Sequence, residues 1–429
     1  MSMTSDPIRK YDVAVIGLGY IGLPTAAFFA NAGLEVYGMD LNPSLVENVN
    51  HGTLPFNEPG LEALLSNVVA TKRLRAGTEL NRAQAYIIAV PTPIRPDKLA
   101  DLSFVHNAAD TIAPLLEGGE LIVLESTCPP GLTEEIAQRI LDARPDLTDN
   151  GTKASSVFFA HAPERVLPGK IMAEMQTNAR IVGGVTEDAT EMARDLYKTF
   201  CDGEILTTDS RTAEMAKLAE NAFRDVNIAF ANELSIVCDK LGIDIWELRF
   251  LANKHPRVDI LQPGPGVGGH CIAIDPWFIV HSAPDSARLI TTARHVNDDK
   301  PYYVLDKIAE NVDKLETPHS NLCICIFGIT FKPDIDDLRE SPALQITERL
   351  AEQYPDAKIG VVEPNLHKLP KNLASKDNTF FTDFKTGLKA ADIAVVLVDH
   401  TLFRENAQDL ERHPNLIDTR GITNWCKSV

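Results

Sequence analysis

The chain has 429 residues, of which 44% are hydrophobic, and it carries 41 Lys and Arg against 60 Asp and Glu. This length exceeds what one hydrophobic core usually serves, so two or three domains are expected. The formal net charge of -19 disfavours nonspecific binding to nucleic acid or to an anionic membrane surface. An anionic substrate would therefore need a local cluster of basic residues.

The cysteines and the N-terminus indicate a reduced, cytoplasmic protein. The seven cysteines are scattered without zinc-finger spacing, and we predict no metal site. Cys323 and Cys325 share one face of the apolar run LCICIFG, which favours packing in a strand over metal binding. The polar segment MSMTSDPIRK has no apolar region typical of a secretion signal. The apolar region 13–39 contains five glycines and a proline, so we expect a strand, a turn and a helix there and no membrane insertion.

Short β-branched runs alternate with helical patterns from Asp12 to about residue 207. The expected strands are DVAVIG, EVYGMD, AYIIAV, ELIVLES, VFFAHAP and RIVGG. The segments between them have lengths suited to crossover helices, which predicts a mostly parallel, doubly wound sheet. Ligands of such a sheet bind at the carboxyl ends of the strands.

A dinucleotide fingerprint follows the first expected strand. Gly17, Gly19 and Gly22 form G-x-G-x-x-G between DVAVI and a helical segment, the context in which this motif binds pyrophosphate. Asp40 ends the next strand, where a carboxylate accepts from the adenosine ribose and repels a 2'-phosphate. The sequence therefore predicts NAD in preference to NADP. The alternative is a merely glycine-rich turn between a strand and a helix.

Polar residues that follow later strands are further candidates for contacts with the cofactor at the carboxyl ends of the strands. Thr92 follows one strand, and Ser126 and Thr127 follow the next, with helix capping at Ser103 or Thr127 as the alternative. Glu164 and Arg165 follow VFFAHAP, and for them the alternative is an exposed ion pair.

The middle of the chain is expected to be helical. Residues 211–241 contain neither proline nor glycine, and their apolar positions repeat at helical spacing, which predicts one helix of roughly 45 Å. Another helical stretch follows Asp244, and a third ends at about residue 312. The length of this helical middle suits a dimer interface. One face of the long helix carries Glu214, Lys217, Asn221 and Arg224, and the usual meaning of such a polar stripe is solvated surface.

The segment GPGVGGHCIAIDP places Cys271 behind a run of glycines. Glycine allows another molecule to approach the backbone closely, and a thiolate can hold an aldehyde carbon covalently. A cysteine nucleophile in a protein with a nicotinamide cofactor suggests oxidation of an alcohol through the aldehyde to an acid. The alternative is that Cys271 is a small buried hydrophobe in a tight turn. His270 is adjacent to Cys271, but neighbouring side chains often diverge, so it is not assigned as the base.

A second, smaller α/β domain is expected after a linker at residues 316–321, because CICIFGITFK, KIGVVEP, DIAVVLVDH and NLIDTRG again alternate with helical patterns. The predicted architecture is α/β, with two Rossmann-like doubly wound domains joined by a helical middle domain. The predicted boundaries are 1–207 for the NAD domain, 208–315 for the dimerising middle and 316–429 for the C-terminal domain.

These motifs, taken together, resemble the UDP-glucose/GDP-mannose dehydrogenase family over nearly the whole chain. The resemblance is carried by GLGYIGLPTA, EPGL, EST, PERVLPG, AEMAKLAENAFRDVNIAFANE, GPGVGGHCIAIDP and ITFKPDIDDLRESPA. His270 and Ile274 stand where the glucose branch of the family commonly has serine and lysine. With HPRVDILQPGPGVGGHCIAIDPWFIV, they make the chain more similar to the branch that acts on N-acetylated sugars.

The resemblance implies roles for individual residues. Cys271 matches the nucleophile, and Lys217, Asn221 and Asp275 match family residues around it. Thr127 and Glu164 match residues near the nicotinamide and the hydrolytic water, and Arg339 matches a cofactor contact from the C-terminal domain. Lys332 and Arg420 match contacts to the nucleotide or sugar, and Arg257 matches an arginine supplied by the partner subunit. Neighbouring motif residues complete the predicted cofactor and substrate sites: Tyr20 and Ile21, and Arg165, Val166, Arg224, His255, Gly266 and Phe331.

The expected reaction is an NAD-dependent four-electron oxidation of carbon 6 of a UDP-N-acetylhexosamine. N-acetylmannosamine is the first expectation, and N-acetylglucosamine and N-acetylgalactosamine are alternatives. Whether Glu164 or Asp275 orients the hydrolytic water stays open at this point. A different class is a noncatalytic sensor of NAD and nucleotide sugars, although such a sensor would not need Cys271, Lys217 and Asn221 together. The expected partners are the nucleotide sugar and a second copy of the chain.

Overall fold

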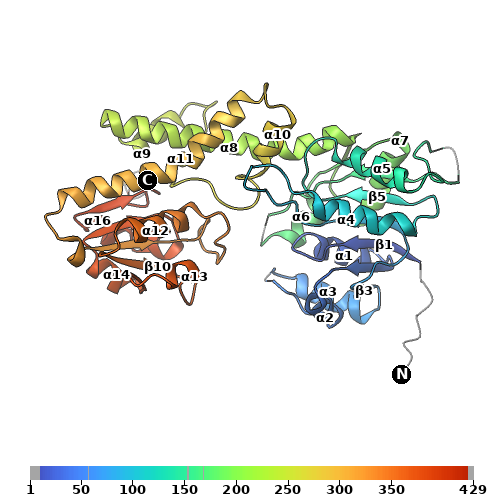
Figure 1. Cartoon of the computed structure of the whole chain (residues 1–429), viewed down its shortest axis with the longest axis horizontal. Helices are drawn as coiled ribbons and strands as arrows, with labels where there is room; N and C mark the ends of the chain where they lie inside the picture. The colour runs from blue at the N-terminus through green and yellow to red at the C-terminus, as the bar shows by residue number, and fades with distance from the viewer. Residues whose placement is uncertain (1–9, 57, 152–153, 168, 424–429) are drawn as a thin grey trace. The chain divides into compact units, whose positions relative to one another are not determined.

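The computed structural model describes residues 10–423 except 57, 152–153 and 168 (Figure 1). The N-terminal segment, for which no secretion signal is predicted, and Cys426 lie outside the described residues. The chain divides into two compact units. The first comprises residues up to Ala219 together with Trp277–Ser282, and the second comprises Glu220–Pro276 and the chain from Ala283 onward.

The first unit contains an eight-stranded sheet in the order β3-β2-β1-β4-β5-β6-β7-β8. Only the pairing of β6 with β7 is antiparallel, which confirms the mostly parallel, doubly wound sheet. The six predicted strands form, whereas β3 and β8 were not predicted. The strands are β1 (Tyr11–Ile16), β2 (Val36–Met39), β3 (Leu74–Gly77), β4 (Ala83–Ile88), β5 (Leu121–Leu124), β6 (Phe158–His161), β7 (Arg180–Gly184) and β8 (Ile205–Asp209).

Helices cover both faces of this sheet because successive strand residues point to opposite faces. Val13 and Val15 of β1 enter a core with α1, α3 and α7, while Ala14 and Ile16 enter a second core with α4 and α5. Chain order reverses between β1 and β4, which is where a doubly wound sheet binds its ligand. The helices are α1 (Gly22–Asn31), α2 (Pro43–Asn50), α3 (Leu61–Ala70), α4 (Ser103–Ile112), α5 (Leu132–Ala143), α6 (Ile171–Thr177) and α7 (Glu187–Tyr197).

One continuous helix, α8 (Ser210–Leu241), follows β8, as the sequence predicted for residues 211–241. It is followed by α9 (Ile245–Ala252), α10 (Asp275–Ser282) and α11 (Arg288–Lys314). Buried polar contacts join α8 to α11 in the second unit. Arg294 donates to Asp225 over 2.5 Å, and Asn232 donates to Asn297 over 2.9 Å. Asn232 also accepts from the backbone N–H of Gly264, so α8 anchors the start of the glycine-rich loop.

The second unit also contains a parallel sheet in the order β11-β10-β9-β12-β13, which is the predicted second α/β layer. Cys323 and Cys325 are buried on one face of β9 with their Sγ atoms 3.9 Å apart, as predicted for strand packing. The strands are β9 (Cys323–Phe327), β10 (Lys358–Val362), β11 (Thr379–Phe381), β12 (Ile393–Val396) and β13 (Leu416–Asp418). The helices are α12 (Pro342–Gln353), α13 (Lys371–Ala374), α14 (Phe384–Ala390), α15 (Thr401–Glu405) and α16 (Ala407–Glu411).

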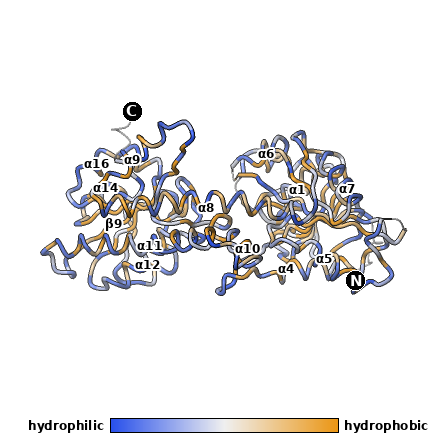
Figure 2. Tube along the Cα trace, turned by 90° about the horizontal axis from the view of Figure 1, so that it is seen from above, coloured by the Kyte–Doolittle hydropathy of each residue, from blue (hydrophilic) through white to orange (hydrophobic). Residues whose placement is uncertain are grey.

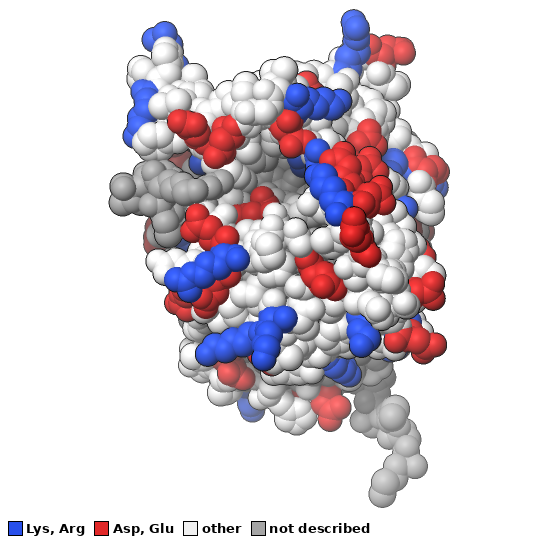
Figure 3. Space-filling view, turned by 90° about the vertical axis from the view of Figure 1, so that its left-hand side faces the viewer, with Lys and Arg blue, Asp and Glu red and all other residues white. Residues whose placement is uncertain are grey.

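Hydrophobic residues form the buried core of each unit, and charged residues of both signs lie on the surface. Figure 2 shows the hydrophobic segments gathered inside each unit. On the face drawn in Figure 3, Lys and Arg side chains are interspersed with Asp and Glu instead of forming one basic patch. Among the described residues, none of the helices combines the length and the apolar character needed to cross a bilayer.

Candidate active site

The glycine turn after β1 has the shape that a pyrophosphate needs. Gly17 adopts a φ of +91°, and a Cβ on it would lie 2.5 Å from the carbonyl oxygen of Ala89. A Cβ on Gly22 would lie 1.9 Å from the carbonyl oxygen of Gly17, so these two positions exclude any side chain. Gly19 is exposed and has no atom within 4 Å of such a Cβ, which leaves open space for the cofactor beside the amino end of α1. Ile21 precedes α1 and gives it no side-chain cap.

Asp40 lies directly after β2 and contacts this turn. Its carboxylate accepts from the backbone N–H of Leu18 over 2.9 Å and from that of Asn42 over 2.9 Å. These bonds hold the two carboxylate oxygens at the carboxyl edge of the sheet, and each oxygen keeps a lone pair. The arrangement fits an acid that accepts from the ribose hydroxyls of NAD.

We predict that Asp40→Ala weakens NAD binding by at least about tenfold, because hydrogen bonds to a charged group are lost. The preference for NAD over NADP should narrow, since the repulsion of a 2'-phosphate also disappears. Calorimetric titration with NADH and NADPH measures both effects. Asp12→Ala is a matched control, because Asp12 accepts from the backbone N–H of Glu35 at the opposite edge of the sheet. A wild-type protein that prefers NADPH would contradict the assignment.

Glu58 ties the glycine turn to the segment after β6. It is 3% exposed, and it accepts from the hydroxyl of Tyr20 over 2.5 Å and from the backbone N–H groups of Gly169 and Ile171. Burial, reinforced by the bond to Glu58, raises the pKa of Tyr20. The sequence showed Glu58 only as part of the EPGL motif, and nothing in that motif indicated which backbone it would bind.

Hydroxyl groups join the carboxyl ends of β4 and β5. The Thr92 hydroxyl donates to the carbonyl oxygen of Thr127 over 2.7 Å, and the Ser126 hydroxyl donates to that of Val90 over 2.7 Å. The capping alternative is wrong, because α4 and α5 both begin without a side-chain cap from the residue before them. Thr92 and Thr127 thus lie at the edge of the sheet that binds ligands, and their role as cofactor contacts stays a prediction.

The first turn of α8 is fixed by a buried carboxylate at the amino end of α5. Glu214 accepts from the N–H of Gly131 over 2.5 Å, from the N–H of Thr133 over 2.8 Å and from the Thr133 hydroxyl over 2.6 Å. It is 1% exposed, and Asn221 on the same polar stripe is also buried. The expectation of a solvated face is therefore wrong for these two residues. Each polar group is buried with a partner that the helical pattern does not reveal.

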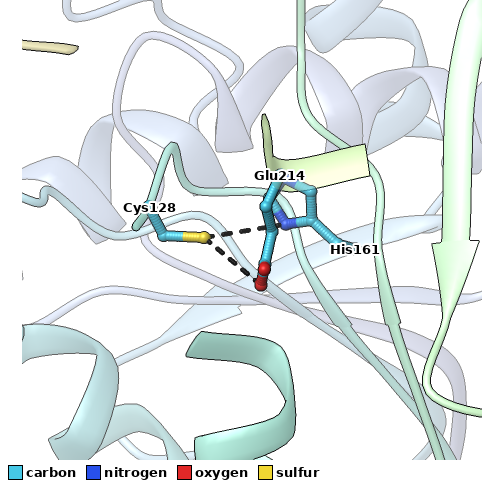
Figure 4. A group of neighbouring side chains, drawn as sticks. All are labelled: Cys128, His161 and Glu214. Atoms are coloured by element: carbon cyan, nitrogen blue, oxygen red, sulfur yellow. Dashed lines mark hydrogen bonds between the residues drawn. The ribbon is translucent and has the colours of Figure 1, made fainter. Parts of the chain in front are cut away.

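Cys128 and His161 complete this cluster (Figure 4). The Cys128 Sγ lies 3.7 Å from a Glu214 oxygen and 4.0 Å from the His161 Nδ1. The three side chains have ligand-type atoms within 4.8 Å of one another. Glu214 already accepts from two backbone N–H groups and two side chains, so we interpret the cluster as a hydrogen-bonded junction. It holds the turn before Lys217 against the segment that follows Thr127.

Glu164 is not part of an exposed ion pair with Arg165. Its side chain is 6% exposed and pairs with the buried guanidinium of Arg180 over 2.5 Å. The backbone N–H of Arg165 donates to the other Glu164 oxygen over 2.7 Å, and the Arg165 side chain donates to the carbonyl oxygen of Ala179. Val166 is half-buried immediately afterwards. Arg180 therefore fixes the carboxylate that was predicted to act on water, and this partner was not predicted from the sequence.

A second buried carboxylate, Glu125, shares this guanidinium at 3.7 Å. It accepts from the hydroxyls of Thr25 over 3.0 Å and Tyr197 over 3.2 Å. Burial and then the charge of Glu164 raise the pKa of Glu125 to about 8, against the opposing effect of Arg180. The buried Arg180 guanidinium thus faces two carboxyl groups, of which Glu125 keeps its proton near neutral pH.

The raised pKa of Glu125 predicts a pH-dependent stability. The folded protein keeps this proton up to about pH 8, whereas the unfolded chain loses it above its ordinary value of 4.5. Between these values the unfolded state binds fewer protons, so Glu125 lowers stability as pH rises. We expect Glu125→Gln to raise the melting temperature at about pH 9 relative to wild type, and less so at about pH 5. Glu120→Gln, at a buried carboxylate bound by backbone N–H groups, is the control. Melting curves that shift equally at both pH values would contradict the prediction.

In the second unit, the glycine-rich loop packs closely on the segment after β9. A Cβ on Gly268 would lie 2.4 Å from the carbonyl oxygen of Glu340, and one on Gly269 would lie 2.9 Å from the ring of Phe331. Gly266 likewise packs on the ring of Pro342. Cys271 at the end of this loop is exposed, whereas the other cysteines that the structure describes are buried. The alternative of a buried structural cysteine is therefore wrong.

Two further candidate residues, Asn221 and Asp275, contact each other where α10 begins, just after Cys271 in the chain. The carbonyl oxygen of Cys271 accepts from the N–H groups of Ile274 and Asp275, which begins α10. Asp275 is 4% exposed, and its carboxylate accepts from the Asn221 amide over 2.6 Å. Lys217 is half-buried and precedes Asn221 by one turn of α8.

Basic residues border the same loop. Arg339 binds the carboxylate of Asp337, and Cys271 lies close enough to interact with the charge of Arg339. Arg420 binds Asp399 over 2.9 Å and donates to the carbonyl oxygen of Pro263 over 3.3 Å. The remaining candidates for substrate binding have exposed side chains: Arg224, His255, Arg257 and Lys332.

Comparison with known proteins matches this chain to three domains of one family. The NAD binding domain of the UDP-glucose/GDP-mannose dehydrogenase family matches residues 11–201, its central domain matches 211–299 and its UDP binding domain matches 325–424. A UDP-N-acetyl-D-mannosamine dehydrogenase of Yersinia pestis is 49% identical over 96% of this chain and 98% of its own. An NDP-N-acetyl-D-galactosaminuronic acid dehydrogenase of Ralstonia nicotianae is 49% identical over 96% of each chain.

Solved structures agree with this match. A UDP-D-ManNAc dehydrogenase from Pyrococcus horikoshii has a TM-score of 0.83 and 34% identity over 96% of each chain. A UDP-N-acetyl-mannosamine dehydrogenase from Staphylococcus aureus has a TM-score of 0.82 and 38% identity over 96% of this chain and 95% of its own. The chain is an NAD-dependent nucleotide-sugar dehydrogenase, and it belongs to the UDP-glucose/GDP-mannose dehydrogenase family.

Proposed function

We propose that this protein oxidises carbon 6 of UDP-N-acetyl-D-mannosamine to the uronate in a four-electron reaction that consumes two NAD. The observation that carries the proposal is the exposed Cys271 at the end of a glycine-rich loop, in a chain whose first unit is an NAD binding domain. The choice of sugar is supported by relatives 49% identical that are named UDP-N-acetyl-D-mannosamine dehydrogenases. A UDP binding domain matches the C-terminal part.

The first oxidation converts the primary alcohol to an aldehyde. When bound, NAD accepts the hydride in each of the two oxidation steps. Lys217 accepts the proton of the alcohol or stabilises the alkoxide that forms, and Asn221 holds the sugar oxygen. Asp275 binds the Asn221 amide nitrogen, which orients the amide of Asn221.

The second oxidation needs a covalent adduct, because an aldehyde has no good hydride to give until a nucleophile adds to it. The Cys271 thiolate adds to the aldehyde carbon, and loss of hydride from this thiohemiacetal leaves a thioester. Water then attacks the thioester, the carbon–sulfur bond breaks, and the uronate leaves while the thiol regains a proton. Glu164 and Asp275 are the two candidates for orienting this water, and each is a buried carboxylate held by a partner, Glu164 by Arg180 and Asp275 by Asn221.

Two other readings predict different observations. Oxidation of the galactosamine isomer is favoured by the relative that is named for N-acetyl-D-galactosaminuronic acid, and the glucosamine isomer is a further alternative. A noncatalytic sensor would bind NAD and the nucleotide sugar but produce no NADH. The discriminating experiment incubates the protein with NAD and each UDP-N-acetylhexosamine, with UDP-glucose for comparison, and follows NADH absorbance. The proposal expects the highest kcat/KM for the N-acetylmannosamine isomer, and no NADH from any sugar would overturn it.

We also propose a homodimer built on the exposed face of α8. Phe223, Phe230 and Val237 recur every seven residues and are 70%, 56% and 43% exposed, and Leu241 is 66% exposed one turn later. Exposed apolar residues at this spacing form a continuous stripe suited to a second helix. In this proposal residues 208–315, between the predicted boundaries at 207 and 315, form the dimerising middle. Arg257 is exposed between α9 and the glycine-rich loop, and we propose that it completes the substrate site of the partner chain.

A further inference from the structure

The carboxyl edge of the second sheet repeats the glycine turn of the first but closes it. Gly328 follows β9 with a φ of +90°, and the next N–H, from Ile329, donates to Glu363 over 2.8 Å. Glu363 follows β10 as Asp40 follows β2. Asp40 is half-buried, whereas the side chain of Glu363 is 0% exposed because His400 covers it. The acid at this edge is thus occupied by the protein itself and is closed to a ribose.

His400 joins this acid to a loop on its other side. Its side chain is 0% exposed, and Nε2 lies 3.1 Å from Glu363. The backbone N–H of Asp334 donates to Nδ1 over 2.9 Å. A backbone N–H can only donate, so Nδ1 is the acceptor and Nε2 carries the hydrogen that is given to Glu363. The Asn365 amide lies 3.1 Å from Nδ1, and the Thr330 hydroxyl lies 3.4 Å from Nε2.

Asp334 needs such an anchor. Its φ of +60° lies in the left-handed region, which is unfavourable for a residue that is not glycine. Its carboxylate accepts from the N–H of Thr401 over 2.9 Å and from the Thr401 hydroxyl over 2.7 Å. His400 and Thr401 together hold the tip of the loop between Ile329 and Ser341, which we call the basic loop because it carries Lys332 and Arg339.

The other side of the basic loop supports the cysteine. The carbonyl oxygen of Arg339 accepts from the N–H of Gly269 over 3.2 Å, and the ring of Phe331 packs on the same glycine. The carbonyl oxygen of Lys332 accepts from the Thr330 hydroxyl over 2.9 Å. A displacement of Asp334 would therefore move Lys332 and the surface beneath Cys271 together.

We propose that His400 is a positioning residue whose Nδ1 holds Asp334 and thereby fixes the basic loop for substrate binding. This rests on the proposed function, in which Lys332 contacts the nucleotide sugar. The bond from Nε2 to Glu363 serves a separate purpose, which is to keep a buried carboxylate paired. The two nitrogens can be tested separately, because an asparagine amide reaches about as far as Nδ1 and a glutamine amide about as far as Nε2.

The test compares His400→Gln with His400→Asn in the full-length protein. The Gln variant keeps a donor for Glu363 and loses the acceptor for Asp334, so KM for the UDP-sugar should rise about tenfold, the value of one lost hydrogen bond. The Asn variant keeps the acceptor, so its KM should stay within about threefold of wild type while its melting temperature falls. If it does not fold, His400→Asn with Glu363→Gln, which removes the unpaired charge, takes its place.

His413→Gln is the matched control. His413 also accepts a backbone N–H at Nδ1, from Asn415, and its Nε2 contacts the carbonyl oxygen of Ala391, away from the basic loop. We expect its KM to be unchanged.

Hydrogen exchange at the Asp334 amide gives a readout that is independent of activity. The exchange should be faster in His400→Gln and unchanged in His400→Asn. Equal KM shifts in the two variants, or unaltered exchange at Asp334 in the Gln variant, would overturn the inference. A wild-type protein that oxidises no UDP-sugar would overturn the proposed function instead, and the exchange experiment would still decide whether His400 holds the loop.

Discussion

Replacing Cys271 by alanine is expected to lower uronate formation by at least about a thousandfold and to leave NAD binding unchanged. The thiol holds the sugar and not the cofactor, so the second oxidation has no adduct from which hydride can leave. Uronate is measured by chromatography of the nucleotide sugars, and NAD affinity by calorimetric titration. Cys201→Ala, at a buried cysteine of the first unit, is the control. A Cys271→Ala protein that forms uronate at the normal rate would remove the covalent mechanism.

Cys271→Ser extends this test. A serine hydroxyl can add to the aldehyde, but an alkoxide is a poorer leaving group than a thiolate, so the acyl-enzyme should accumulate. Mass spectrometry of the intact protein would show the sugar adduct, and peptide mapping would place it on residue 271.

The second large effect is complementation between chains. If Arg257 acts in the partner's site, Arg257→Ala and Cys271→Ala chains are each inactive, but their heterodimer contains one site with both residues intact. A guanidinium suits this task because a UDP dianion needs several donors in a protein with a net charge of -19. Random mixing of equal amounts should recover about a quarter of wild-type activity, since half of the dimers carry one working site of two.

The control mixes two batches of Cys271→Ala chains, which should stay inactive. Native mass spectrometry confirms that heterodimers have formed. Heterodimers without recovered activity would place Arg257 in the site of its own chain or outside the site.

The strands that the sequence failed to predict share one property: β3, β8 and β11 lie at sheet edges. An edge strand has a neighbour on one side only and is partly exposed, so it lacks the continuous apolar run of an inner strand. β8 reads ILTTD and has a mostly exposed pattern. Inner strands such as β1 and β9 are buried along nearly their whole length, and their β-branched runs were sufficient to predict them.

In the candidate site, too, the features carried by short motifs could be predicted, whereas the contacts between residues distant in the sequence could not. Gly17, Gly22 and Cys271 belong to motifs whose meaning is local, and the structure gives them the conformation and exposure that the motifs require. Their chemical roles stay predictions.

The partners of the buried charges could not be predicted. Glu214 binds Thr133 across 81 residues, and His400 binds Glu363 across 37 residues. A polar stripe on a helix usually indicates a solvent-exposed face. It is buried only when another segment of the chain packs on it, and a single sequence does not show which segment does so.

The most direct test of the central claim is the ratio of NADH formed to sugar consumed with UDP-N-acetyl-D-mannosamine as substrate. We predict two NADH for each uronate and no aldehyde released to a trapping amine, because Cys271 holds the intermediate between the two oxidations. One NADH per sugar, with an aldehyde recovered as the product, would contradict it.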